Sequence, residues 1–191
     1  TVTVVVDELA HEVTTFRKDV ATDGRRATVA FSKDIIEDAR RRDFTMNALY
    51  ADADGQVIDP LGGITDIEAR HVRFIEAPTT RIRADYLRIL RFIRYHAWFG
   101  EPARGLDADG LAACAELADG ISHLSKERIG AEMTKLLAAP DPAPAVAAMR
   151  SAGVLARVLP GAEDGFLAPL VHLEENWAPS FLRRLAILGG E

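Results

Sequence analysis

The chain has 191 residues, of which 48% are hydrophobic and 27% charged, and its formal net charge is −6. This composition is typical of a globular protein and excludes a disordered or fibrous chain. The negative charge argues against bulk attraction to nucleic acid but is compatible with a local basic groove. No apolar run is long enough to span a membrane, no signal peptide is visible, and the single cysteine, Cys114, excludes an internal disulfide. We therefore expect a cytoplasmic protein with no membrane partner.

The first 75 residues mix strand and helix patterns. Two β-branched runs, 1–6 and 11–17, flank a polar turn and predict a hairpin. The polar, glycine-containing stretch 18–33 predicts a flexible loop. The patterns that follow predict a helix at 34–44, a strand–turn–strand unit at 48–60 with its turn at Asp-Ala-Asp-Gly, a short helix at 62–70 and a last strand at 71–75.

From Thr79 onward the apolar residues recur with a helical period. Those of the first segment fall on one face and predict a single amphipathic helix over 80–98: Ile82, Tyr86, Ile89, Ile93 and Ala97. Further helices are expected at 107–120, 125–137, 141–153, 167–177 and 180–188, the second of them with Ser125 as its N-cap. The change of pattern places a domain boundary near residues 75–78. The chain starts in an apolar run without Met and stops near a helical pattern, so we expect it to be an internal piece of a longer protein.

An arginine-rich segment, ARRRDFTMNALY at 39–50, is the first candidate site. Arginine suits phosphate, because its planar guanidinium donates two parallel charge-assisted hydrogen bonds. Asp43 is suited to accept a hydrogen bond from a sugar hydroxyl, and Asn47 follows it by one helical turn. On charge alone, a solvated helix end with local ion pairs is the favoured alternative.

The segment RIRADYLRILRFIR at 81–94 is the second candidate site, with five arginines and one carboxylate beside its apolar stripe. Asp85, Arg88 and Arg91 fall at i, i+3 and i+6, so a continuous helix would align them on one edge. An aspartate fixed beside an arginine presents acceptors and donors in a rigid frame that can read the edge of a base. The alternative is a surface salt-bridge ladder, which the excess of cation over acid disfavours.

Metal sites and other catalytic motifs are not apparent. Asp52 and Asp54 have the spacing of a metal-binding pair, but Gly55 follows directly, so a hairpin tip is the simpler interpretation. The five histidines have no ligand spacing and no cysteine partners, and this pattern argues against a zinc site. There is no nucleophile elbow, no P-loop and no dinucleotide-binding glycine motif.

Five motifs in order nevertheless carry a resemblance: EVTTFR at 12–17, RRDFTMNALY at 41–50, IDPLGGITDIEAR at 58–70, RADYLRILRFIRY at 83–95 and LSKERIGAEMTKLL at 124–137. Their succession resembles the bacterial class II tRNA nucleotidyltransferase (CCA-adding enzyme) and poly(A) polymerase family, whose members add CCA or A to RNA 3′ ends. The resemblance implies that Arg42 binds the triphosphate and Asp43 a ribose hydroxyl. It also implies that Asp85 and Arg88 select C or A, with Arg91 as a further nucleotide contact. Ala84 stands where the family motif has Glu.

The resemblance also implies catalysis with two Mg²⁺ ions and the substrates CTP and ATP. The family's metal-binding Asp-x-Asp lies upstream of Thr1, so no metal is expected within the chain and the fragment alone should be inactive. Glu12 is the one candidate for a third catalytic acid. The implied partners are tRNA or another RNA 3′ end and the nucleoside triphosphates, not DNA.

We therefore predict an α+β fold: a partial nucleotidyltransferase head with a mixed sheet and helices at 1–77, a nucleotide-selecting helical neck at 78–138, and the start of a helical body at 139–191. The predicted activity is metal-dependent nucleotidyl transfer, most simply CCA addition to tRNA. Two alternatives stay open: a poly(A) polymerase that adds only A, and a non-catalytic RNA-binding fragment.

Overall fold

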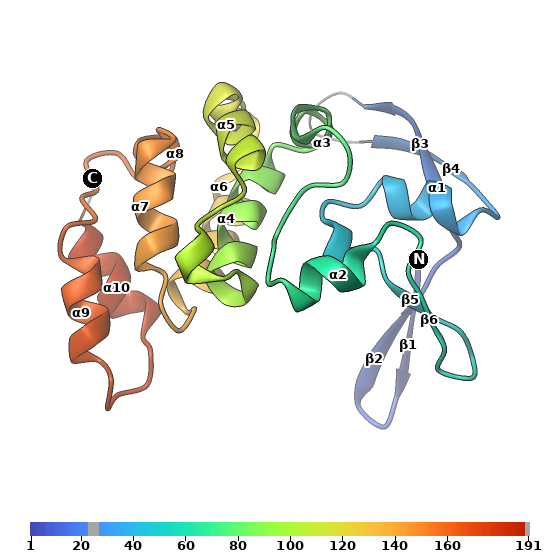
Figure 1. Cartoon of the computed structure of the whole chain (residues 1–191), viewed down its shortest axis with the longest axis horizontal. Coiled ribbons are helices and arrows are strands. Elements are labelled where there is room, and N and C mark those ends of the chain that lie inside the picture. Colours follow the sequence, from blue (N-terminus) through green and yellow to red (C-terminus); the bar gives the residue numbers. More distant parts are fainter. Residues whose placement is uncertain (23–26, 190–191) are drawn as a thin grey trace.

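The computed structural model describes residues 1–22 and 27–189. It is an elongated molecule with small sheets and short helices at one end and a stack of helices at the other, and the two termini lie in these opposite parts (Figure 1). The predicted α+β class is confirmed. The described strands form three separate antiparallel pairs in place of the predicted mixed sheet, because each strand pairs only with its neighbour along the chain.

The first sheet is an antiparallel hairpin of β1 (Val2–Val6) and β2 (Leu9–Val13). Asp7 and Glu8 connect the strands with φ of 50° and 64°, the left-handed backbone that a tight two-residue hairpin turn requires. The predicted hairpin is confirmed, although its second strand begins earlier than expected. Every residue of both strands is exposed, so this hairpin contributes no side chain to the core.

A second antiparallel pair, β3 (Arg17–Thr22) and β4 (Ala27–Phe31), occupies the segment predicted to be a flexible loop. That prediction is wrong for the described residues, because backbone pairing satisfies the donors and acceptors of these strands whatever the polarity of their side chains. The remainder of the predicted loop, 23–26, lies outside the described residues.

The segment after β4 folds into short elements. α1 (Ile35–Arg40) begins at Asp34, whose side chain accepts a hydrogen bond from the Ile36 amide, and is shorter than the predicted helix. A 3₁₀ turn, η1 (Thr45–Asn47), follows. β5 (Tyr50–Ala51) and β6 (Val57–Ile58) confirm the predicted strand–turn–strand unit.

The aspartates of the β5–β6 turn have a local structural role. The Asp52 carboxylate accepts hydrogen bonds from the amides of Asp54 and Gln56, at 3.0 and 2.8 Å, and so closes the turn. The interpretation of this segment as a hairpin tip is confirmed.

The glycine pair before α2 (Gly63–Glu68) meets two separate requirements. Gly62 has a φ of 74°, which favours glycine. A Cβ at Gly63 would overlap the Thr45 carbonyl, so this glycine allows α2 to approach η1 closely. The predicted strand at 71–75 is reduced to an isolated bridge between Phe44 and Phe74.

The helix predicted over 80–98 is broken in two, so that prediction is wrong. α3 (Pro78–Ala84) ends at Asp85, whose backbone is extended at φ −159° and ψ 110°, and α4 (Leu87–Phe99) begins two residues later. The Asp85 side chain accepts a hydrogen bond from the Leu87 amide at 3.1 Å, and the Arg88 side chain donates to the Arg81 carbonyl at 2.8 Å. These side chains replace backbone hydrogen bonds that the break removes.

The remaining helices are η2 (Pro102–Arg104), α5 (Ala108–Glu116), η3 (Ala118–His123), α6 (Lys126–Leu137), α7 (Ala143–Ser151), α8 (Val154–Val158), α9 (Leu167–Leu173) and α10 (Phe181–Leu188). The helix predicted over 107–120 is divided between α5 and η3, and η2 was not predicted. Ser125 caps α6 as predicted, through the Arg128 amide, whereas α8 was not predicted. Buried α4 residues join one hydrophobic core that runs from the Phe44–Phe74–Phe92 aromatic group to Leu188. α4 packs against both α6 and α7, so it is the central helix of this core.

Candidate functional site

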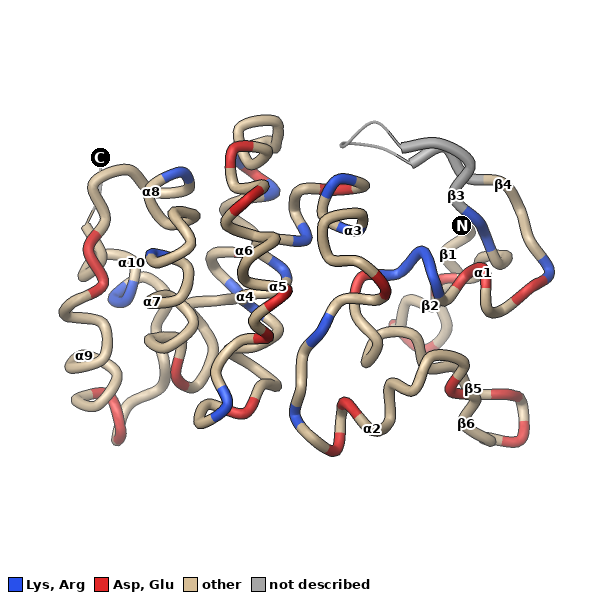
Figure 2. The backbone as a smooth tube through the Cα atoms, turned by 45° about the horizontal axis from the view of Figure 1, so that its top comes forward, with Lys and Arg blue, Asp and Glu red and all other residues tan. Residues whose placement is uncertain are grey.

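A polar pocket of about 510 Å³ lies where the end of α1 and η1 meet α4 and the first turn of α6. Its lining residues are Arg41, Arg42, Asp43, Asn47, Asp85, Leu87, Arg88, Arg91, Tyr95 and Arg128. The structure thus gathers all of the predicted site residues except Glu12, although they come from separate stretches of sequence. With five arginines and two aspartates, the lining is strongly cationic. The basic run at the end of α1 approaches α3 (Figure 2).

Asp43 lies on the floor of the pocket and is buried. One carboxylate oxygen accepts hydrogen bonds from the Phe44 amide and the Asn47 side chain, both at 2.9 Å, and the other accepts from Arg91 Nε at 2.6 Å. Asn47 therefore orients Asp43 from the next turn of the same segment. The ion pair with Arg91 connects residues 41–45, the RRDFT segment, to α4.

Arg42 is held by a second buried carboxylate, that of Asp38. Its Nε and Nη2 donate to Asp38 Oδ2 at 3.3 and 3.1 Å, and its Nη1 donates to the Asn47 carbonyl at 3.1 Å. The guanidinium also lies over the Tyr50 ring, with Cζ 4.9 Å from the ring centre. This cation–π contact and the ion pair fix its position at the edge of the pocket.

The charge state of this cluster follows from its contacts. Burial alone would raise the pKa of Asp38, but hydrogen bonds from Tyr50, from the Arg17 amide and from Arg42 bring it below its usual value. Burial and the hydrogen bond to Asp38 raise the pKa of Tyr50. At neutral pH the cluster therefore contains a carboxylate, a guanidinium and a protonated phenol.

The sequence suggests Arg88 as the partner of Asp85, and the structure places a further arginine, Arg128, against the same carboxylate. Asp85 Oδ2 accepts a hydrogen bond from Arg128 Nη2 at 2.7 Å, so this ionic partner comes from α6. Arg88 donates to the Arg81 carbonyl and, through Nη2, to the Arg41 carbonyl at 2.8 Å. The rigid frame exists, and it contains an Asp85–Arg128 pair beside an Arg88 anchored to backbone.

Arg91 and Tyr95 form the wall of the pocket on α4. Arg91 lies over the Tyr95 ring at 5.4 Å as well as pairing with Asp43. Burial lowers and the neighbouring Asp43 charge raises the pKa of Arg91, and the net change is upward. Arg91 is therefore a permanent cation in this wall.

Glu12 lies in β2, away from the pocket lining, and its side chain is exposed. Within the described residues there is no group of three or more His, Cys, Asp or Glu side chains arranged to hold a metal ion. The residues described here therefore do not fit a resident Mg²⁺, and no catalytic step is assigned to a metal held by them.

Arg41, Tyr95 and Arg128 belong to the lining but were not among the predicted site residues. Arg128 lies in the first turn of α6, the helix that Ser125 caps. Forty-three positions separate it from Asp85, so the sequence spacing gives no indication that the two side chains are in contact. A pairing of this kind depends on tertiary packing and cannot be predicted from a local sequence pattern.

A second hollow of about 620 Å³ lies between α6, the end of α8 and α10. Its lining is mainly aliphatic and aromatic, including Ile129, Met133 and Leu185. It offers no cluster of charged groups comparable with that of the polar pocket, which is therefore the candidate site.

No helix within the described parts of the chain is long and apolar enough to cross a membrane.

Comparison with known proteins identifies two family models along the chain. A model described as the poly A polymerase head domain matches residues 1–73, and one described as a probable RNA and SrmB-binding site of polymerase A matches residues 106–166. The first contains the RRDFT segment, and the second contains α6 with Arg128.

Individual relatives give the same result. The chain is 40% identical over 190 residues to the CCA-adding enzyme of Geobacillus kaustophilus, covering 93% of this chain and 46% of the relative. It is 42% identical over 137 residues to the mouse mitochondrial CCA tRNA nucleotidyltransferase 1, covering 72% of this chain and 32% of that protein. The chain thus spans less than half the length of these relatives.

Among solved structures, the Bacillus stearothermophilus CCA-adding enzyme in complex with CTP superposes with a TM-score of 0.72 at 31% identity. The match covers 96% of this chain and 49% of that enzyme. Order of motifs, fold and relatives agree, and the chain belongs to the family of CCA-adding tRNA nucleotidyltransferases and poly(A) polymerases.

Proposed function

We propose that the protein transfers nucleotidyl groups from CTP and ATP to an RNA 3′ end, and that it does so as CCA addition to tRNA. The observation that carries the proposal is the cationic pocket, which brings together Arg42, Asp43, Asp85, Arg88 and Arg91. Two named relatives are CCA-adding enzymes, and a related structure contains CTP, which supports nucleotide as the ligand.

Each part of a nucleoside triphosphate has a suitable partner in the pocket. Arg42 and Arg91 supply forked donors for phosphate oxygens. Asp43 accepts from a ribose hydroxyl. Asp85 accepts from the exocyclic amino group that both cytosine and adenine carry, whereas uracil and guanine present a carbonyl oxygen at the corresponding place. An acceptor at Asp85 therefore admits C and A and rejects U and G.

In the proposed reaction the terminal hydroxyl of the RNA attacks the α-phosphate of the nucleotide. A bond from the RNA oxygen to phosphorus forms, the bond to the bridging oxygen breaks, and pyrophosphate leaves. Mg²⁺ would supply charge neutralisation at the phosphates, with ligands that the family resemblance places outside this chain. The residues of this chain bind and select the nucleotide, and alone they are expected to bind nucleotide without transferring it.

The division into head (1–77), neck (78–138) and body (139–191) is part of the proposal. The pocket supports a functional junction near residue 77, because its walls come from α1–η1 on one side and α4 and α6 on the other. The cytoplasm is the proposed location, as a place where tRNA and nucleoside triphosphates meet.

The test is to incubate the full-length protein with tRNA lacking CCA and with labelled CTP or ATP supplied separately or together. Incorporation of C followed by A supports CCA addition. Incorporation of A alone would identify a poly(A) polymerase, which is the competing activity within the family. Absence of both would favour the non-catalytic RNA-binding alternative.

A matched pair of variants connects activity to the pocket. Arg91→Gln removes a cation from the wall and should reduce incorporation of both nucleotides. Arg150→Gln makes the same change on α7, where Arg150 pairs with Asp164 on the surface, and should leave incorporation unchanged. Equal activity of the two variants would refute the pocket assignment.

A further inference from the structure

Asp38 lies outside the pocket lining, yet it contacts the pocket through Arg42. We propose that Asp38, together with the Tyr50 hydroxyl, is a positioning residue that presents Arg42 to the phosphates of the nucleotide. This inference rests on the proposed function of Arg42 as a phosphate ligand. It adds a residue that neither the motifs nor the comparisons assign.

The hydrogen bonds of Arg42 leave part of its guanidinium available. A guanidinium has five N–H donors in a fixed planar fork. Asp38 accepts from Nε and Nη2, and the Asn47 carbonyl accepts from Nη1. These three contacts use three of the five N–H groups, and a guanidinium N–H that they leave over can donate a charge-assisted hydrogen bond to a phosphate oxygen. The Arg42 side chain is 39% exposed, so such a donor can be reached from the pocket.

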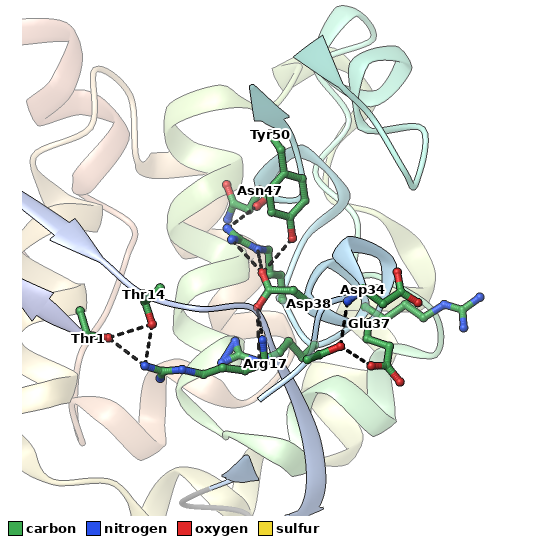
Figure 3. Close-up of polar contacts among 12 residues, drawn as sticks. Thr1, Thr14, Arg17, Asp34, Glu37, Asp38, Asn47 and Tyr50 are labelled. Atoms are coloured by element: carbon green, nitrogen blue, oxygen red, sulfur yellow. Dashed lines mark hydrogen bonds and ion pairs between the residues drawn. The ribbon is translucent and has the colours of Figure 1, made fainter. Parts of the chain in front are cut away.

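Asp38 is itself held from three directions. Its Oδ1 accepts from the Arg17 amide at 3.1 Å, and its Oδ2 accepts from the Tyr50 hydroxyl at 2.9 Å in addition to Arg42. Figure 3 shows Asp38 between Arg17 on one side and Tyr50 on the other. The carboxylate thus links β3, α1 and β5, and Arg42 is attached to a rigid point.

The carboxylate is required for this role. An amide at position 38 would direct an N–H₂ group or a neutral oxygen toward the guanidinium, and the charge-assisted pair would be lost. Arg42 would then lose the contact that keeps its plane over Tyr50, and its free N–H groups would no longer be aligned before ligand binds. Such a loss of preorganisation weakens binding of the group that Arg42 contacts.

The test is equilibrium binding of CTP and CMP to the full chain, because their affinity ratio isolates the contribution of the β- and γ-phosphates. Asp38→Asn is expected to lower CTP affinity about tenfold, the effect of one charge-assisted contact. The proposal assigns Arg42 to the β- and γ-phosphates, which CMP lacks, so CMP affinity should change less than about twofold. Glu37→Gln is the matched control, because it makes the same charge change one residue earlier on α1, where Glu37 contacts Lys18 and Ser32.

Tyr50→Phe is the second variant and tests the proposal even if Asp38→Asn fails to fold. It keeps the ring beneath Arg42 and removes only the hydroxyl that Asp38 accepts. We expect a smaller loss of the CTP-to-CMP ratio, about threefold. An unchanged ratio in a folded Asp38→Asn protein, or in Tyr50→Phe where Asp38→Asn does not fold, would overturn the proposal. An equal loss for both ligands would reduce Asp38 to a purely structural residue and would also overturn it.

Arg42→Gln separates this inference from the proposed function. If Arg42→Gln keeps the wild-type CTP-to-CMP ratio, Arg42 is not a phosphate ligand, and both the function of Arg42 and the inference fall. If Arg42→Gln lowers the CTP-to-CMP affinity ratio and Asp38→Asn leaves it at the wild-type value, only the positioning role of Asp38 is refuted. With the proposal correct, the double variant Asp38→Asn/Arg42→Gln has the same ratio as Arg42→Gln alone, because both changes act through one side chain.

Discussion

Replacement of Arg128 by methionine tests whether the Asp85–Arg128 pair controls base selection. The two side chains are 39% and 28% exposed, so their ion pair contributes at most about 1 kcal/mol to the free energy of unfolding after solvent screening. Arg128→Met should therefore remain folded. Its effect should appear in binding, because Arg128 donates a hydrogen bond to the Asp85 carboxylate, as the Leu87 amide also does.

The magnitude follows from what a correctly placed acceptor contributes to base recognition. A good hydrogen-bonding match to a base edge discriminates by about 1–3 kcal/mol, which is roughly 5- to 150-fold. In Arg128→Met the Asp85 carboxylate keeps its hydrogen bond from the Leu87 amide, so we expect about half of the free energy of base discrimination to be lost. The preference for CTP over UTP should then fall by about twofold to twelvefold.

The assay is titration calorimetry of CTP and UTP with the wild-type chain, Arg128→Met and Asp85→Ala. Arg157→Met is the control, since Arg157 pairs with Asp119 outside the polar pocket. Parallel weakening of both nucleotides in Arg128→Met, with the CTP-to-UTP ratio preserved, would refute the reasoning. An unchanged ratio in Asp85→Ala would instead refute the role of Asp85 itself.

Three further predictions concern buried groups. Arg184 is 1% exposed and donates to Glu174 and to three main-chain carbonyls at the end of α6, so Arg184→Met should cost about 3 kcal/mol of unfolding free energy in urea denaturation. Burial lowers the pKa of His96, so below about pH 6.5 the unfolded chain binds a proton that the native chain does not, and stability should fall on acidification. His96→Gln should reduce the loss of unfolding free energy between pH 7 and pH 5, and an unchanged slope would contradict this assignment. Burial raises the pKa of Cys114 to about 12, so iodoacetamide at pH 8 should label it in urea but not in the native protein, as mass spectrometry would show.

The elements with strong local patterns were predictable from the sequence. The β1–β2 hairpin follows from two β-branched runs around a polar turn, and α6 follows from its Ser125 cap and helical period. The apolar stripe of 80–98 was also correct, because Ile82, Ile89 and Ile93 are all fully buried. These features depend on residues close together in the chain.

The errors arise where distant contacts decide the outcome. The helix break at Asp85 leaves the apolar stripe intact, so periodicity could not reveal it. Pairing of β3 with β4 outweighed a composition that resembles a loop. The motifs named six residues that line the polar pocket but not Arg41, Tyr95 or Arg128. The pairings in the pocket, Asp43 with Arg91 and Asp85 with Arg128, depend on how separate segments pack.

The extended backbone at Asp85 has a consequence for the evolution and redesign of base preference. One carboxylate accepts a hydrogen bond from the Leu87 amide in the first turn of α4 and also lines the pocket. A side chain that accepts from the amide two residues later is typically short and carries an acceptor oxygen, namely Asp, Asn, Ser or Thr. A new specificity introduced at this position must therefore be encoded by one of very few residues. Broader changes of base preference are easier to reach through a neighbour such as Arg128, which donates to Asp85 from α6.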